Sequence, residues 1–365
     1  MTARSSVVRP VMPPGRPAIR DLNRRHSYAV EWDVRPAFDL VLSLSAEAGQ
    51  TDDLPTRDRE WLAAAKAGLR AELGDALELF ASEFCTVLAI IALDRPEVRS
   101  AADFVALLDA TDEPAIIRTL FFGDRDTERQ ALVERAMNGD EAAVDELLRL
   151  ETDHRRPESR EAIAALYRDP AAGVAAARTV LRAWLPRFEE VETRVAGMID
   201  RDFAARAGDR ASLDPTTLVE RTTGGIRWLP EPGIRRVILA PSYFARPYNF
   251  VLSGADWRMF AYPIADAALD EADPLAPPQT VVRLHRALGD ETRLRILKLL
   301  TSRDWYLSEI AQQLELSKPT IKHHLALLRA AGLVTLTEEG SLSYYSLRRD
   351  RVAEGSAELG TFLGT

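Results

Sequence analysis

The most constraining feature of the sequence is a pair of amphipathic segments joined by a turn of three residues near the C-terminus. LSEIAQQL, residues 307–314, spaces its apolar side chains as a helix does, and the turn ELS follows it. Ser317, before Lys318 and Pro319, predicts a helix start, because serine caps free N–H groups and proline suits a first turn. The second helix is expected to stop near Gly332. Two helices joined in this way, with a basic start to the second, have the geometry of a helix that enters a DNA major groove.

This second helix is predicted to have an inward and an outward side. Its inward face consists of Ile321, Leu325 and Leu328. Thr320 and His323 are expected opposite this face or at its margin. Lys318 and Lys322 are long enough to reach phosphates or guanine edges.

The flanking segments complete a recognisable order of elements. VVRLHRAL and GDETRLRILKLL, residues 281–300, predict two more helices, the second with Asp290 and Glu291 at its start, where the helix dipole favours acids. LVTLTEEGSLSYYSL, residues 333–347, alternates apolar and polar side chains about the turn EEGS and predicts a β-hairpin. Basic residues follow it directly: Arg348, Arg349 and Arg351. The hairpin is the expected wing.

Charge supports a polyanionic partner for this region alone. Residues 281–351 hold 12 Lys and Arg against 8 Asp and Glu, a net of +4 in a chain whose overall net charge is -9. The rest of the chain therefore carries -13. Such asymmetry suggests that one part binds a polyanion and the other does not.

ALGDETRLRIL followed by HLALLRAAGLV, together with the hairpin, resembles the winged helix-turn-helix of the ArsR/SmtB family of bacterial transcriptional regulators, over about 75 of the 365 residues. The resemblance implies that DNA is read by the start of the recognition helix: Ser317, Lys318, Thr320, Lys322 and His323. A serine commonly stands where this chain has Lys322, so base preference does not transfer. The resemblance also implies a homodimer, built from the first helix and the segment after the wing.

A metal site is not expected. His323 and His324 are adjacent, so they point about 100° apart on a helix, and no second pair stands nearby at ligand spacing. The family's metal sensors use cysteines in the third helix or Asp, His and Glu sets in a terminal helix. Here DWYLSEIAQQL lacks cysteine and VAEGSAELGTFL lacks histidine. No cofactor is expected, and an inducer, if one exists, is organic.

The remainder of the chain divides into three parts. Residues 1–27 hold six arginines, four prolines and one acid, which predicts a disordered tail. Residues 28–270 are expected to be mostly helical, with two apolar stripes, and to end in β-rich runs that form a small antiparallel sheet. The first stripe comprises Leu62, Ala65, Leu69, Leu73, Leu77, Phe80 and Phe84, and the second Phe188, Val191, Val195, Met198 and Phe203. Residues 271–280, rich in proline, are expected to be a linker before a DNA-binding domain at 281–365.

The role of residues 28–270 stays open between three hypotheses. Aromatic residues of the β-rich region either line an effector pocket, with Tyr243, Arg246, Tyr248 and Trp257 as candidate ligands, or form the core of a small sheet. The second hypothesis is an interaction or dimerisation body without a ligand. An enzyme is not expected, because the nearest approach to a phosphate loop is Thr222-Thr223-Gly224-Gly225, a weak match.

These patterns predict a mainly α, α+β fold with a C-terminal winged helix-turn-helix. The predicted protein is a cytoplasmic, homodimeric regulator, a repressor rather than an activator, that binds a pseudo-palindromic operator and senses a non-metal effector through residues 28–270. No segment approaches the apolar length of a membrane span.

Overall fold

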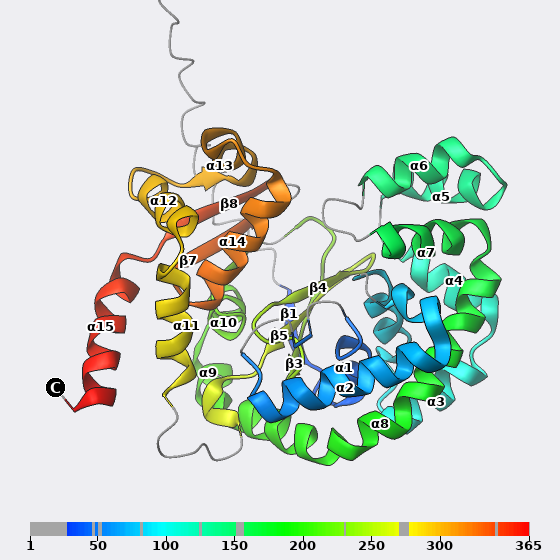
Figure 1. Cartoon of the computed structure of the whole chain (residues 1–365), viewed down its shortest axis with the longest axis horizontal. Coiled ribbons are helices and arrows are strands. Elements are labelled where there is room, and N and C mark those ends of the chain that lie inside the picture. Colours follow the sequence, from blue (N-terminus) through cyan, green and yellow to red (C-terminus); the bar gives the residue numbers. More distant parts are fainter. Residues whose placement is uncertain are drawn as a thin grey trace, which may run out of the picture.

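A computed structural model describes residues 28–364 except for 46–47, 50–52, 81–82, 124–125, 151–156, 230, 270–276 and 340–341. The predicted tail at 1–27 and most of the predicted linker lie outside the described residues. We call residues 28–269 the body and residues 277–364 the reader. Figure 1 shows the reader on the left, a small sheet in the middle and a group of helices on the right, with one long helix below.

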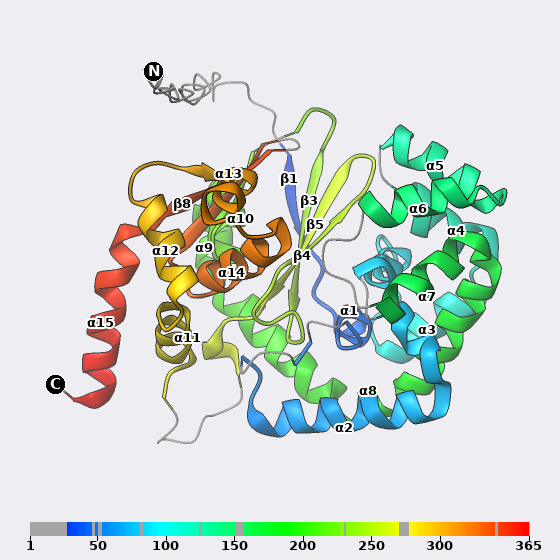
Figure 2. The same ribbon diagram turned by 45° about the horizontal axis from the view of Figure 1, so that its top comes forward.

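The body is mainly helical. Its α-helices are α1 (Ala37–Leu42), α2 (Thr56–Leu73), α3 (Ala101–Ala110), α4 (Glu113–Phe122), α5 (Thr127–Met137), α6 (Glu141–Leu150), α7 (Pro157–Arg168), α8 (Pro170–Ala205), α9 (Ala207–Ser212) and α10 (Pro215–Thr222). Its 3-10 helices are η1 (Gly74–Leu79), η2 (Glu83–Ala92) and η3 (Asp266–Ala268). The longest helix, α8, starts where Asp169 caps the amide of Ala172, and it runs beneath the sheet (Figures 1 and 2).

Both predicted apolar stripes lie against the body core. On α8, four members of the second stripe are buried: Phe188, Val191, Val195 and Met198. Phe203 is half-buried, and its ring packs edge-on against that of Trp32, with the ring centroids 5.4 Å apart. The helix of the first stripe ends earlier than the spacing predicted, because Gly74 adopts a φ of 57° and 3-10 turns follow. Leu77 and Phe80 are still buried, and the side chain of Phe84 is not among those that the structure describes.

The body sheet is mixed rather than antiparallel. Its strands are β1 (Ala29–Trp32), β3 (Arg236–Ser242), β5 (Trp257–Pro263) and β4 (Phe250–Ser253), in that order across the sheet. The predicted hairpin is confirmed, since β4 pairs antiparallel with β5. However, β1 and β5 both pair parallel with β3. The mainly α, α+β fold is confirmed, and only the strand directions of this sheet differ from the expectation.

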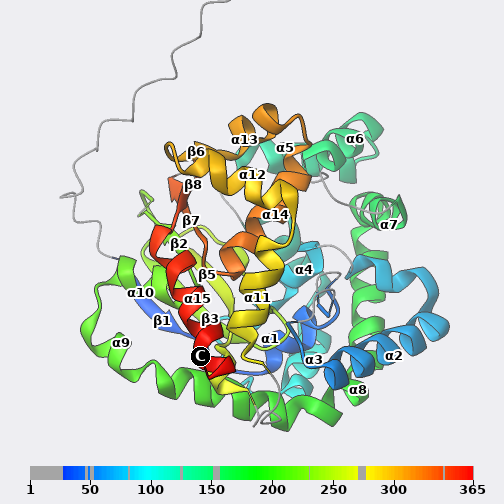
Figure 3. The same cartoon turned by 60° about the vertical axis from the view of Figure 1, so that its left-hand side comes forward.

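The predicted helices and hairpin of the reader occur in the predicted order, together with a two-residue strand and a final helix that the sequence did not predict. The reader consists of α11 (Gln279–Leu288), α12 (Glu291–Leu300), β6 (Trp305–Tyr306), α13 (Leu307–Leu314), α14 (Lys318–Ala330), β7 (Val334–Glu339), β8 (Leu342–Leu347) and α15 (Arg349–Leu363). Asp290 caps α12 by accepting a hydrogen bond from the amide of Arg293. The first and last helices, α11 and α15, lie side by side (Figures 1 and 3).

The sheet of the wing contains a strand that the sequence did not predict. Strand β2 (Ile226–Trp228) belongs to the body in sequence, yet it pairs parallel with β7, so the sheet has the order β2-β7-β8-β6. The body and the reader therefore share a hydrogen-bonded sheet.

Candidate nucleic-acid interface

The recognition helix α14 is fixed at its start by a side-chain cap. The hydroxyl of Ser317 accepts a hydrogen bond of 3.2 Å from the amide of Thr320, and Pro319 stands in the first turn. The two hydroxyls also lie 2.8 Å apart. In the turn before the helix, Glu315 adopts a left-handed conformation with a φ of 57°. Ser317 and Thr320 are exposed, but their hydroxyls already bond to each other.

The two sides of α14 are separated as the spacing predicted. Ile321, Leu325 and Leu328 are fully buried in the core of the reader. The outward residues are exposed: Lys318, Lys322 and His323. Two lysines and an imidazole near the start of a fixed helix are donors for phosphate oxygens and for base acceptors. The helix thus presents a donor-rich surface beside a rigid core.

The arginines after the wing lie at its base. The amide of Arg348 donates to the carbonyl oxygen of Leu333, which closes the hairpin, and its side chain is half-buried. Arg349 is exposed, and its Nη2 donates a hydrogen bond of 2.6 Å to the carbonyl oxygen of Thr301 after α12. Side chains at the tip, residues 338–342, lie outside the description. The described basic groups of the wing therefore border α12 and α15.

His324 is a packing residue rather than a free donor. It is half-buried, and its Nδ1 lies 3.7 Å from Oδ1 of Asp290 with no hydrogen-bond partner. Burial lowers the pKa of His324, and the Asp290 carboxylate only partly opposes this. Burial thus favours the neutral imidazole, which weakens any ion pair with Asp290. Within the described part of the chain, no group of three His, Cys, Asp or Glu side chains is arranged to hold a metal.

The aromatic residues predicted as candidate effector ligands are part of the body core. Tyr243 is fully buried and its hydroxyl donates to the carboxylate of Asp58. Arg246 is 2% exposed and is paired with Asp266. Tyr248 and Trp257 are half-buried and pack against the same core. The observed contacts of these four side chains are therefore those of core packing and of buried polar pairs.

An open cavity of about 720 Å³ lies elsewhere in the body. It is bounded by the ends of β1 and β3, the segment after η2 and one turn of α8. Four arginines and four acids line it: Arg35, Arg95, Arg99 and Arg236, with Glu31, Asp33, Asp94 and Asp200. Arg236 is held in place by hydrogen bonds to Asp94 and Glu31, which raise its pKa further. No pattern in the sequence indicated this site, because its walls come from four separate segments spread between residues 31 and 238.

Among the described residues, none of the helices combines the length and the apolar character that a membrane crossing requires.

Comparison with known proteins places the reader in a family. Residues 290–335 match the family of bacterial regulatory proteins called the arsR family. An uncharacterised HTH-type transcriptional regulator of Methanocaldococcus jannaschii, MJ1325, is 39% identical over 77 residues, which cover 21% of this chain and 86% of that protein. The transcriptional repressor SdpR of Bacillus subtilis is 40% identical over 62 residues, covering 17% of this chain and 69% of the relative.

A solved structure, reduced HlyU from Vibrio cholerae, matches 22% of this chain and 84% of its own, with 32% identity and a TM-score of 0.20. These matches each cover less than a quarter of the chain, and the family match covers residues 290–335. The motifs that carried the resemblance, the capped recognition helix and the wing are all present in the reader. Through this winged helix-turn-helix, which serves DNA binding in transcription regulation, the chain belongs to the arsR family.

Proposed function

We propose that the protein is a homodimeric transcriptional repressor that binds a pseudo-palindromic operator, in the cytoplasm where chromosomal DNA lies. One observation carries the proposal: the exposed donors Lys318, Lys322 and His323 project from the capped start of α14, whose opposite face is fully buried. Repression is favoured because the Bacillus subtilis relative SdpR is a transcriptional repressor.

In this proposal the site residues divide by role. Lys322 and His323 read base edges, while Lys318, Arg348 and Arg349 contact phosphates, and Ser317 with Thr320 fixes the helix start. Phosphate contacts set affinity and register, whereas base contacts set the preferred sequence. A dimer places two recognition helices one helical turn apart, ~34 Å, or a multiple of it, so the operator repeats with that spacing.

The proposal is tested with the full-length chain and duplexes selected by it from a randomised library. We expect a two-fold symmetric consensus, protection of two half-sites and the mass of a dimer in light scattering. A monomer that protects one asymmetric half-site would contradict the dimeric arrangement. Failure to enrich any sequence over random duplex would contradict operator recognition as a whole.

We further propose that the body senses a small polar organic molecule in the 720 Å³ cavity, a volume within the range of small-molecule sites. Because the aromatic set is packed in the core, the cavity takes its place as the candidate site. Its arginines and acids suit a ligand that carries both donors and acceptors. Because the remainder of the chain is strongly acidic and DNA repels it, the body is expected to sit away from the duplex.

Cavity-filling variants test this sensing role. Ala196 lines the cavity on α8, and Ala204 is exposed on the same helix. A metabolite that raises the thermal midpoint of the wild type should fail to do so with Ala196→Phe and should still act on Ala204→Phe. An equal rise in thermal midpoint for both variants would show that the metabolite does not bind in the cavity.

A second candidate is a body that binds no ligand and serves only to hold two readers. The strand shared between the body and the wing favours it, because it joins the two parts without any small molecule. A DNA affinity that no metabolite or cell extract changes would favour this candidate over the sensor.

A further inference from the structure

Strand β2 belongs to two structures at once. Its side chains Ile226 and Trp228 are 2% and 1% exposed and lie in an apolar cluster of the body. The indole of Trp228 packs edge-on against Tyr28, with ring centroids 4.9 Å apart. The backbone of β2 pairs instead with the wing, from Ile226 opposite Leu336 to Trp228 opposite Glu338. The strand is therefore anchored in the body by its side chains and in the reader by its backbone.

The turn before β2 adds a contact to the recognition helix. Arg329, in the last turn of α14, is 8% exposed, and its Nη1 donates a hydrogen bond of 3.3 Å to the carbonyl oxygen of Thr223. The same oxygen accepts a bond of 3.1 Å from Asn249 of the body. One carbonyl thus joins the recognition helix to the segment that leads into the body sheet.

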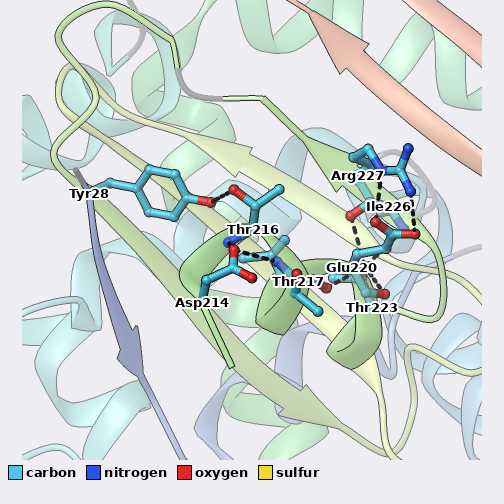
Figure 4. Close-up of polar contacts among 9 residues, drawn as sticks. Tyr28, Asp214, Thr216, Thr217, Glu220, Thr223, Ile226 and Arg227 are labelled. Atoms are coloured by element: carbon cyan, nitrogen blue, oxygen red, sulfur yellow. Dashed lines mark hydrogen bonds and ion pairs between the residues drawn. The ribbon is translucent and has the colours of Figure 1, made fainter. Parts of the chain in front are cut away.

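The turn is shaped for this role by its own residues. The hydroxyl of Thr223 donates to the carbonyl oxygen of Val219 and accepts from the amide of Ile226, at 2.8 and 3.0 Å, as Figure 4 shows in part. Gly224 and Gly225 have positive φ angles of 69° and 114°, which L-residues rarely adopt. The amide of Leu336 in β7 then donates to the carbonyl oxygen of Gly225 at 2.8 Å.

At Gly225 the wing also passes closely. A Cβ at this position would lie 3.4 Å from the carbonyl oxygen of Val334 and 3.5 Å from the methyl of Thr335. In the pattern Thr-Thr-Gly-Gly, a weak match to a phosphate loop, the amides of Thr223, Gly224 and Gly225 already donate to carbonyl oxygens of α10. The carbonyl oxygens of Thr223 and Gly225 accept from α14 and β7. Through these hydrogen bonds the turn forms a joint, a direct connection between the body and the reader.

We propose that residues 223–228 are positioning residues of the DNA reader: they complete the wing sheet and hold the end of the recognition helix, so that DNA affinity depends on body groups that do not touch DNA. The inference rests on DNA binding by α14. It extends the proposed function, because it makes the body a structural part of the reader whether or not an effector binds.

The first test uses Arg329→Met in the full chain, which keeps the apolar stem and removes the donor to Thr223. Arg295→Met is the matched control, since it removes the same charge from an exposed position on α12. We expect Arg329→Met to weaken binding to the library-selected duplex at least tenfold while the salt dependence of binding stays that of the control. A residue that contacts phosphate would instead reduce the salt slope by about one.

The second test approaches the joint from the body. Gly225→Ala strains the turn at a φ of 114° and places its Cβ in van der Waals contact with β7. Gly139→Ala, at a φ of 88° with open space around it, strains a turn far from the reader in sequence. We expect Gly225→Ala to weaken DNA binding and Gly139→Ala to leave it unchanged. Arg329→Lys, which retains a donor, should recover part of the affinity that Arg329→Met removes.

Hydrogen exchange of the free protein separates this inference from the proposed function. Arg329→Met and Gly225→Ala should speed exchange at β7 and at the last turn of α14, while the body helices and the thermal midpoint change little. Unchanged exchange at β7 in both variants would overturn the inference even if no duplex were bound. Lower affinity with a reduced salt slope would also overturn it, because Arg329 would then be a DNA contact.

Discussion

Nη2 of Arg283 lies 3.2 Å from Oδ1 of Asp266, so the first helix of the reader is joined to the segment that follows the body sheet. The same arginine donates through Nε to the carboxylate of Asp53, and Asp266 also pairs with the buried Arg246. This second attachment lies on α11, away from the β2–β7 pairing. Two separate attachments restrain both the position and the rotation of the reader on the body.

Breaking this ion-pair cluster is expected to destabilise the protein. Arg283→Met removes the positive charge that offsets the largely buried carboxylates of Asp53 and Asp266. Urea denaturation should show a loss of about 2 kcal/mol in unfolding free energy. Arg182→Met, which removes a solvent-exposed pair with Asp109, should change this free energy far less, because water and salt screen the pair. Equal effects of the two variants would show that the cluster adds nothing beyond a surface pair.

Asp39 is expected to make stability fall as pH rises. Burial raises its pKa to about 6, although it accepts hydrogen bonds from the hydroxyl of Ser242 and the amides of Tyr243 and Phe244. Because the folded pKa lies above the unfolded value of 3.8, the folded state holds the proton more tightly. The stability that Asp39 contributes in its protonated form is fully present below pH 3.8 and is lost as pH rises through 6.

The comparison that isolates this effect is wild type against Asp39→Asn, which cannot titrate. The difference in unfolding free energy, wild type minus variant, should fall by about 2.4 kcal/mol between pH 4 and pH 7, because the pKa rises from 3.8 to about 6 on folding. Urea denaturation at several pH values measures it. A difference that is flat, or that grows with pH, would contradict the raised pKa.

Base readers and phosphate contacts should respond differently to substitution. Lys322→Ala and His323→Ala should change the preferred base at particular operator positions, by about 1–3 kcal/mol for each hydrogen-bonded base pair that is no longer read. Arg348→Ala and Arg349→Ala should lower affinity for all sequences and reduce the salt slope. Competition binding against single-base operator variants at several salt concentrations separates the two. Equal weakening of specific and random duplexes by all four changes would refute the assignment of readers.

The core beneath the recognition helix should be sensitive to truncation. Leu325 is fully buried, so Leu325→Ala should cost about 3 kcal/mol, because it removes buried apolar surface and leaves a cavity. Leu294 on α12 is 48% exposed, and Leu294→Ala should cost well under about 1 kcal/mol. Thermal unfolding of both variants provides the measurement, and a cost for Leu325→Ala below that of Leu294→Ala would contradict the packing.

The reader was predictable because its signals are local. Ser317 and Asp290 cap the helices that follow them, and the alternating residues of the wing lie within one short stretch. Each of these features depends on neighbours a few residues away. Exposure of Lys322 and His323 followed from the same helical spacing that buried Leu325.

The helical stripes and the β4–β5 hairpin of the body were predictable, but the partners of β1 and β2 were not, because they lie far away in the sequence. β1 joins β3 through Ala29 opposite Arg236, a partner that no local pattern indicates. The three residues of β2 alternate buried and exposed as in any strand. Their sequence does not predict with which sheet the strand pairs. The aromatic residues fitted a pocket or a core equally well in sequence, and only packing shows that Tyr243 is in the core.

Strand β2 precedes its partner β7 by about 100 residues, so the order of synthesis matters to it. While the chain leaves the ribosome, Ile226 and Trp228 can already pack into the body, but the backbone edge of β2 has no partner until residues 334–339 emerge. An unpaired edge is a template for pairing with another chain. The nascent body is therefore most prone to misassembly just before the wing is made, and the wing, once folded, shields that edge.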